Sequence, residues 1–175
     1  MRPIVRRFIQ LLSMLAGAAL AFSASAIYVY TTIDYPGAVF TDVRGLNNTG
    51  RIVGYGSMDG VTNFSFSYSG GVFSALPASP ALPSALGIND AGVIVGATEE
   101  PTGSRGFIFN AGSYSFFARP GWTTTAARAI GNSGLVTGYS TNVDATGTLL
   151  STSGFIYNPA TAAFTDIPVP SYLLI

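Results

Sequence analysis

The feature that most constrains this chain is an internal repeat with a period of 42 residues. Residues 45–55, 87–97 and 129–139 align without gaps and read GLNNTGRIVGY, GINDAGVIVGA and AIGNSGLVTGY. Two glycines, an Asn or Asp position and two aliphatic positions recur in phase. Such a period is typical of arrays in which one supersecondary unit is repeated and neighbouring units bury each other's faces. The chain is therefore expected to fold as a series of like units.

Each unit begins as a β-hairpin. The polar stretch before each glycine predicts a type I turn followed by a glycine bulge, with a positive φ at Gly50, Gly92 and Gly134. The returning strand is short and apolar. It is expected to end at a second glycine that lets a neighbouring backbone or aromatic ring approach closely, namely Gly54, Gly96 and Gly138. Both sets of glycines are interpreted as structural.

The second half of each unit is an aromatic strand, at residues 66–68, 107–109 and 155–157, followed by a tight turn and another short aromatic strand. Phe107, Phe109, Phe155 and Tyr157 alternate with smaller residues, as packing between neighbouring units requires. A four-stranded antiparallel unit of about 42 residues has the size of a propeller blade. The sequence thus predicts an all-β, β-propeller-like array with repeats at 38–77, 78–119 and 120–168, and no helix within 27–175.

One further strand is expected ahead of the first repeat, at residues 28–33. Pro36-Gly37 recurs as Pro120-Gly121 two repeats later, which makes this segment resemble the fourth strand of a unit. Three units and one orphan strand leave open edges, whereas closed propellers have about 4 to 8 blades. Two interpretations stay open: the chain is a fragment of a longer protein, or it closes by self-association through its edge strands.

Residues 1–26 are predicted to be a cleaved signal peptide. Arg2, Arg6 and Arg7 precede an apolar stretch at residues 8–22, and Ala24-Ser25-Ala26 forms a small-x-small cleavage site. A membrane-spanning helix needs about 20 apolar residues, so a retained anchor is the weaker alternative. The mature chain, 27–175, is expected outside the cell or at its surface, with the periplasm as the alternative. The general and twin-arginine export routes both remain open.

Composition excludes several classes of function. The chain has no histidine, cysteine or lysine, which removes the usual nucleophilic triads, imidazole and thiolate metal sites, and Schiff-base chemistry. Only 9 % of the residues are charged. Beyond residue 26, the chain has five arginines and eight carboxylates, and the arginines form no cluster. This charge balance argues against nucleic acid or a membrane surface as a partner. The chain is therefore not expected to be an enzyme.

Carboxylates are the remaining groups for acid–base chemistry or metal binding. Four of them follow the second strand of a unit, so that loops of successive units would present them on one face: Asp59, Glu99, Glu100 and Asp144. Paired carboxylates can hydrolyse glycosides, and oxygen-rich loops can bind Ca²⁺. Turn chemistry is the favoured interpretation, since Asp-Gly and Asp-x-x-Gly are ordinary hairpin turns. No cofactor is expected, with Ca²⁺ as the alternative.

Tyr35 and Trp122 are the candidates for a binding rim. Both lie next to a Pro-Gly turn, where an aromatic side chain is expected to be exposed, and such rings can stack on sugars. The other aromatic residues are assigned to packing.

Three sequence patterns resemble the bacterial extracellular repeat proteins of the HAF family. They are Ile-Asp-Tyr-Pro-Gly-Ala at 33–38, Gly-Ile-Asn-x-x-Gly-x-Ile-Val-Gly at 87–96, and Gly-Phe-Ile-Phe-Asn at 106–110. The resemblance covers the mature chain and implies export and a β-propeller-like fold, without a well-established activity. The chain departs from the family at Gly131, where the second copy has Asn89, and lacks the histidine that often opens the aromatic motif.

The sequence favours a secreted, non-catalytic repeat protein that serves as an extracellular interaction module. A protein that binds or cleaves carbohydrate through the acidic loop face is the alternative, and a structural fragment without a ligand is the third.

Overall fold

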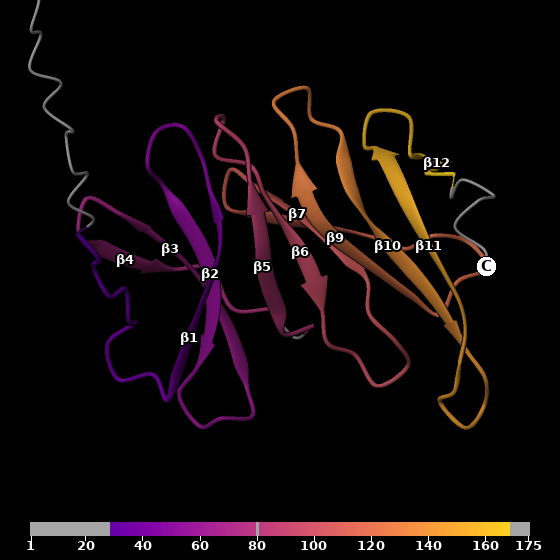
Figure 1. The fold of residues 1–175 in the computed structure, drawn as a ribbon, viewed down its shortest axis with the longest axis horizontal. Coiled ribbons are helices and arrows are strands. Elements are labelled where there is room, and N and C mark those ends of the chain that lie inside the picture. The colour runs from indigo at the N-terminus through magenta and orange to yellow at the C-terminus, as the bar shows by residue number, and fades with distance from the viewer. Residues whose placement is uncertain (1–28, 80, 169–175) are drawn as a thin grey trace, which may run out of the picture. The chain divides into compact units, whose positions relative to one another are not determined.

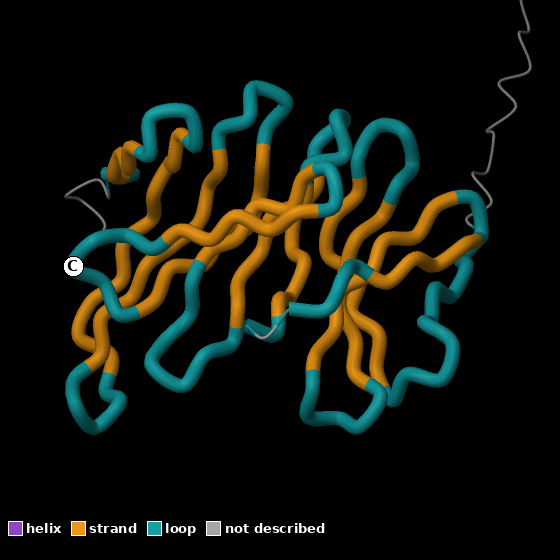
Figure 2. The backbone as a smooth tube through the Cα atoms, turned by 180° about the vertical axis from the view of Figure 1, so that it is seen from behind, coloured by secondary structure: helices purple, strands orange, loops and turns teal. Residues whose placement is uncertain are grey.

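The computed structural model describes residues 29–79 and 81–168, which contain strands and loops and no helix (Figures 1 and 2). The predicted signal peptide at 1–26 lies outside the described residues. All strands belong to one compact unit that begins at Ile33. No helix in the described part of the chain is long and apolar enough to cross a membrane.

Twelve strands form three four-stranded antiparallel sheets, each a simple meander. Sheet 1 consists of β1 (Phe40–Leu46), β2 (Ile52–Ser57), β3 (Asn63–Ser69) and β4 (Val72–Ala75). Sheet 2 consists of β5 (Pro83–Ile88), β6 (Ile94–Thr98), β7 (Gly106–Asn110) and β8 (Ser113–Phe117). Sheet 3 consists of β9 (Thr124–Ile130), β10 (Val136–Val143), β11 (Leu149–Asn158) and β12 (Ala163–Asp166). The expected array of four-stranded units is confirmed at this level, and closure into a propeller stays a prediction.

The turn between the first two strands of each sheet has the expected form. In sheet 1 the Gly50 N–H donates to the Asn47 carbonyl at 3.1 Å, and the Asn47 N–H donates to the Arg51 carbonyl at 3.1 Å. The same pair of bonds recurs in the other two sheets at positions 42 and 84 residues further on. The glycines that close these turns, Gly50, Gly92 and Gly134, have φ values of +78°, +80° and +83°. A positive φ favours glycine at this position.

The second set of glycines lies inside a strand, which corrects the expectation that each ends its strand. β2, β6 and β10 continue for two or more residues beyond Gly54, Gly96 and Gly138. A Cβ on any of the three would collide with a backbone carbonyl of the preceding strand and with a phenylalanine ring, as at Gly96 with the Ser84 carbonyl and Phe107. These glycines provide the close approach that was expected of them.

Each first strand carries a β-bulge, which the sequence does not reveal. The register shifts between Val43 and Gly45 in β1, and the same shift recurs 42 and 84 residues later in β5 and β9. The bulge leaves one residue of each first strand outside the regular pairing: Arg44, Leu86 and Arg128. A bulge redirects a side chain away from the pleat.

Sheet 2 is packed on both faces. On one face Ile94 and Phe107 form an apolar cluster with Val53 of sheet 1. On the other face Val95 packs with Phe155 and Tyr157 of sheet 3. Phe107 and Phe155 are fully buried, which confirms that the aromatic alternation serves packing between units. The aromatic faces of sheets 2 and 3 therefore each meet the aliphatic face of the sheet before them.

Asparagine side chains connect the three turns. The Asn47 Nδ2 group donates to the Asn89 carbonyl at 3.1 Å, and the Asn89 Nδ2 group donates to the Gly131 carbonyl at 3.3 Å. Asn47 Oδ1 meanwhile accepts the Arg51 N–H of its own turn at 2.9 Å, and Asn89 Oδ1 accepts the Val93 N–H at 3.0 Å. Each asparagine thus closes one turn and fixes its position relative to the next. We call this series the asparagine ladder.

The expected orphan strand is not found among the residues that can be examined. Residues 29–33 form no strand, and Tyr28 lies outside the described residues. An orphan fourth strand would have to pair with the third strand of a sheet. In each described sheet the third strand already pairs with a fourth strand of its own, namely β4, β8 or β12. Residues 35–38 instead form a turn, in which the Ala38 N–H donates to the Tyr35 carbonyl at 3.1 Å.

Candidate functional site

Asp59 organises its own loop between β2 and β3. Its Oδ1 atom accepts hydrogen bonds from the backbone N–H groups of Thr62 at 2.7 Å and Val61 at 2.8 Å, and from the Ser57 hydroxyl at 2.8 Å. These donors, the Thr62 N–H first, hold the pKa of Asp59 well below its ordinary value. All three donors belong to the same hairpin, so the carboxylate acts in turn formation.

Asp144 has the same function between β10 and β11. It accepts bonds from the Thr146 hydroxyl at 2.6 Å and from the N–H groups of Thr146 and Thr148, both at 2.8 Å. The Thr146 hydroxyl, followed by the Thr148 N–H, lowers the pKa of Asp144. Asp144 is therefore also bound within a single loop.

The two glutamates have different partners. Glu100 accepts from Arg105 Nε at 2.7 Å, and this bond is the main cause that lowers the pKa of Glu100. Glu99 accepts from Asn63 Nδ2 of sheet 1 at 2.9 Å. Within residues 29–79 and 81–168, no group of three or more acidic side chains gathers as a metal site would require. The four carboxylates are therefore bonded to separate partners and do not gather in one metal-binding cluster in this part of the chain.

Tyr35 is not an exposed rim residue, which corrects the expectation. Its ring lies 4.7 Å from Phe64, 5.1 Å from Phe73 and 5.7 Å from Phe66, measured between ring centroids. These three phenylalanines belong to the aromatic face of sheet 1. The corresponding face of sheet 2 is contacted by Leu76, which directly follows β4. The corresponding face of sheet 3 is contacted by Phe117 of β8. Among the residues that the structure describes, no sheet precedes sheet 1, and Tyr35 packs in the position that such a sheet would occupy.

Trp122 is also less available than expected. It is half-buried, and the Arg119 guanidinium lies 4.7 Å from the centre of its ring. Arg119 in turn pairs with Asp166 at the end of β12. One face of the indole is therefore covered by a cation that also pairs with sheet 3.

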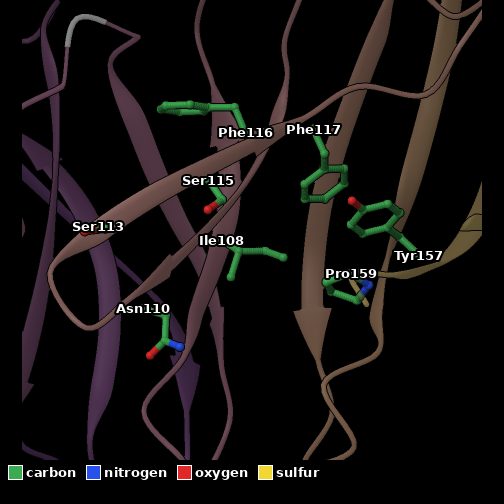
Figure 3. A pocket seen from close by; sticks show the side chains of 8 residues that line it. All are labelled: Ile108, Asn110, Ser113, Ser115, Phe116, Phe117, Tyr157 and Pro159. Carbon is green, nitrogen blue, oxygen red and sulfur yellow. The ribbon is translucent and has the colours of Figure 1, made fainter. Parts of the chain in front are cut away.

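A groove of about 390 Å³ lies between sheets 2 and 3 (Figure 3). Residues of β7 and β8 line one side, and Tyr157 and Pro159 line the other. The rings of Phe117 and Tyr157 stack with centroids 4.2 Å apart and an angle of 9° between their planes. Figure 3 shows these two rings side by side with Phe116 turned away from them. We call this recess the outer groove.

The outer groove combines an apolar wall with a polar rim. Ser113, Ser115 and Asn110 are exposed and lie next to Ile108 and the Phe117–Tyr157 ring pair. This combination of apolar surface and a few hydroxyl and amide groups is typical of small-ligand sites. Sequence reasoning missed the groove because its walls come from two repeats. The available signal was the alternation of Ser113, Ser115 and Phe117 on one face of β8.

A scan against protein-family models gives no match for this chain, and a search of curated proteins gives none either. The resemblance to the HAF family therefore stays a prediction.

Proposed function

We propose that this chain is a secreted, non-catalytic repeat protein that acts as an extracellular or cell-surface interaction module. The outer groove is the observation that carries the proposal, because it is a concave surface with both apolar and hydrogen-bonding walls. Asp59 and Asp144 accept hydrogen bonds from N–H groups of their own loops, which supports a non-catalytic function. Export after cleavage behind Ala26, membership in the HAF family and closure into a propeller belong to the same proposal.

Carbohydrate is the alternative ligand, and one observation favours it. The Phe117–Tyr157 ring pair stands beside the hydroxyls of Ser113 and Ser115 and the amide of Asn110. Aromatic surface bordered by hydroxyl and amide groups suits a sugar, whose C–H faces are apolar and whose rim is polar. The groove is a better candidate for this than the acidic loops, whose carboxylates are already bonded to protein groups.

A glycan array tests both versions of the proposal. The secreted chain is applied with and without Ca²⁺, and any ligand found is then titrated. Ser115→Tyr fills the outer groove from an exposed position on β8, and we expect it to weaken binding about tenfold or more. Ser74→Tyr places the same side chain at the equivalent exposed position on β4 and is the matched control.

Unchanged binding by Ser115→Tyr would remove the groove from the proposal. If ligand binding required Ca²⁺ and was lost in Asp59→Asn, the ligand site would be assigned to the acidic loops. An enzyme would require hydrolysis of a glycan that disappears in Glu99→Gln or Asp59→Asn. Mass spectrometry of the exported protein checks the compartment, because the proposal predicts Ile27 as the first residue.

Self-association also belongs to the proposal. Leu149 and Leu150 on β11 are 60 % and 66 % exposed, and Leu46 at the end of β1 is 66 % exposed. Exposed apolar residues on open sheets favour contact with another chain.

A further inference from the structure

A second recess lies among strands β2, β5, β6, β9 and β10, and it differs from the outer groove in both place and chemistry. It has a volume of about 160 Å³ and is lined by residues from all three sheets. Tyr55 comes from β2, Ala97 from β6 and Tyr139 from β10. These three residues occupy the same position in successive repeats. We call this recess the inner cleft.

The repeat itself explains why a cleft forms there. The flanking repeats have tyrosine at this position, whereas the middle repeat has Ala97. Ala97 pairs across β5 and β6 with Ser84, in the register by which Asp42 pairs with Tyr55 and Ala126 pairs with Tyr139. Small side chains in the middle sheet therefore leave space beside the larger residues of its neighbours.

Two bulge arginines hold equivalent places but have different neighbours. Arg44 and Arg128 each donate from Nη2 to a tyrosine hydroxyl at 3.1 Å, Tyr55 and Tyr139 respectively. Arg44 also forms an ion pair with the Asp42 carboxylate at 2.5 Å. The residue equivalent to Asp42 in the third repeat is Ala126, which lines the inner cleft. Among the described residues, the ion pairs involve Arg44, Arg105 and Arg119, and none involves Arg128.

Arg128 is fixed in orientation, because its guanidinium also lies over the Tyr139 ring at 5.0 Å from the centroid. Arg128 thus has a hydrogen-bond partner but no carboxylate partner among the described residues, and a second polar group of the cleft has no hydrogen-bond partner at all. Ser84 is only 9 % exposed, and its hydroxyl has no hydrogen-bond partner. An unpartnered buried hydroxyl is unfavourable unless a ligand or solvent molecule satisfies it. The cleft therefore offers an oriented cation and an unused hydroxyl.

We propose that the inner cleft binds a small hydroxylated carboxylate, such as a single sugar-acid unit. The ligand carboxylate pairs with Arg128 and supplies the interaction that Asp42 supplies to Arg44. Glu99 lines the same cleft, and although its Oε1 atom accepts from Asn63, a carboxylate has further acceptor positions, so the remainder of the ligand is expected to carry hydroxyl donors. The volume limits the ligand to about one such unit.

Calorimetric titration of the full chain with sodium D-glucuronate tests the proposal. D-Glucose provides the ring without the carboxylate, and acetate provides the carboxylate without the ring. We expect saturable binding of glucuronate, weaker binding of acetate and no measurable binding of glucose. Higher salt should weaken the binding of glucuronate, because the arginine is exposed to solvent.

Two variants assign the binding to Arg128. Arg128→Gln should weaken glucuronate binding about tenfold or more, since a charge-assisted pair is lost. Ala126→Asp places a carboxylate where Asp42 stands in the first repeat and should reduce binding by occupying Arg128 internally. Arg44→Gln is the matched control, because Arg44 holds the equivalent bulge position and donates to the equivalent tyrosine, Tyr55, but does not line the cleft. It should leave binding unchanged.

Absence of saturable glucuronate binding would overturn the proposal, as would equal binding of glucose. Equal effects of Arg128→Gln and Arg44→Gln would also overturn it, because they would indicate a general charge effect. The result is independent of the outer groove, since Ser115→Tyr should not change the titration.

Discussion

The two sets of glycines in the repeat serve different physical purposes, and substitutions distinguish them. Gly134 has a φ of +83° and open space around the position of a Cβ. At Gly138, four residues later, an added Cβ would collide with the Ala126 carbonyl oxygen and would lie 2.8 Å from Phe155 Cζ. The first glycine is required by its backbone conformation, and the second by its lack of a side chain.

We expect Gly134→Ala to lower the free energy of unfolding by about 1 kcal/mol, the cost of placing an L-residue at positive φ. Gly138→Ala should lower it by about 3 kcal/mol, because backbone and ring must both move. Chemical denaturation of the two variants provides the comparison. A larger loss for Gly134→Ala would contradict the packing described for β9, β10 and β11.

Acid sensitivity follows from the loop carboxylates. The pKa values of Asp59 and Asp144 are lowered in the folded chain by hydrogen bonds from their own loops. A lowered folded pKa contributes stability above the unfolded value of about 3.9, and that stability is lost as the pH falls through the folded pKa. Without histidine, side chains add no comparable transition between about pH 5 and 8.

The melting temperature should therefore be nearly constant from about pH 5 to 8 and should fall below about pH 4. In the double variant Asp59→Asn with Asp144→Asn, the fall should be smaller, because asparagine can still accept the loop hydrogen bonds without titrating. Thermal melts at several pH values provide the measurement. An unchanged acid profile in the double variant would show that other groups govern it.

At the scale of the secondary-structure elements, the aromatic face of sheet 1 depends on Tyr35. The ring contacts Phe64, Phe66 and Phe73, and it takes the place that residues of a preceding sheet hold against sheets 2 and 3. Tyr35→Ala should lower the free energy of unfolding by about 2 kcal/mol without changing ligand binding. Tyr30→Ala, at a residue that is 91 % exposed, is the control. Loss of binding without loss of stability would restore Tyr35 as a rim residue.

The sequence predicts the elements well where one repeat determines the outcome. The turn at Gly50, the strand after it and the burial of Phe107 follow from local turn chemistry and alternation. The β-bulge at Arg44 has no such signal, because nothing in the local pattern marks a residue that drops out of the pairing. The extent of β2 beyond Gly54 is unpredictable for a related reason, because a glycine within a strand resembles the end of that strand.

The candidate sites were harder to predict because they lie between repeats. Ser115 and Tyr157 meet in the outer groove only when sheets 2 and 3 are stacked. Arg128 and Ser84 likewise come from different repeats. Tyr35 and Trp122 were expected to be exposed because of the adjacent Pro-Gly turns, but turn position alone does not reveal which surface a ring can cover.

At the scale of the whole molecule, sheet 3 differs from the other two on the face that would receive another sheet. Gly45 and Gly87 let the next first strand approach, since a Cβ on Gly87 would lie 2.9 Å from the Arg128 carbonyl oxygen. The third repeat has Ala129 at this position. The asparagine ladder also stops, because Gly131 has no side-chain amide.

A third difference is Thr137, which replaces the buried Val53 and Val95 of the first two repeats. We therefore expect the outer face of sheet 3 to bind poorly to sheet 1 of a second copy in the geometry used between sheets. The triple variant Ala129→Gly, Gly131→Asn and Thr137→Val should self-associate more strongly. Sedimentation velocity at matched concentrations tests this, and equal sedimentation of the variant and the natural chain would contradict it.

The 42-residue repeat is the structural unit of this chain, and adjacent repeats lie in register. Asn48 Nδ2 and Asp90 Oδ2 are 2.8 Å apart although they are 42 residues apart in the chain. In contrast, Asn48 and Thr62 are close in sequence, but they lie at opposite ends of β2, a strand that spans roughly 20 Å.

Because the chain has no native cysteine, cysteine pairs can be introduced and linked with a short bifunctional thiol reagent. Mass spectrometry of the folded monomer then reports which pair reacts within one molecule. We predict linkage for Asn48→Cys with Asp90→Cys and no linkage for Asn48→Cys with Thr62→Cys. Linkage of the second pair without the first would contradict the stacked arrangement of the three sheets.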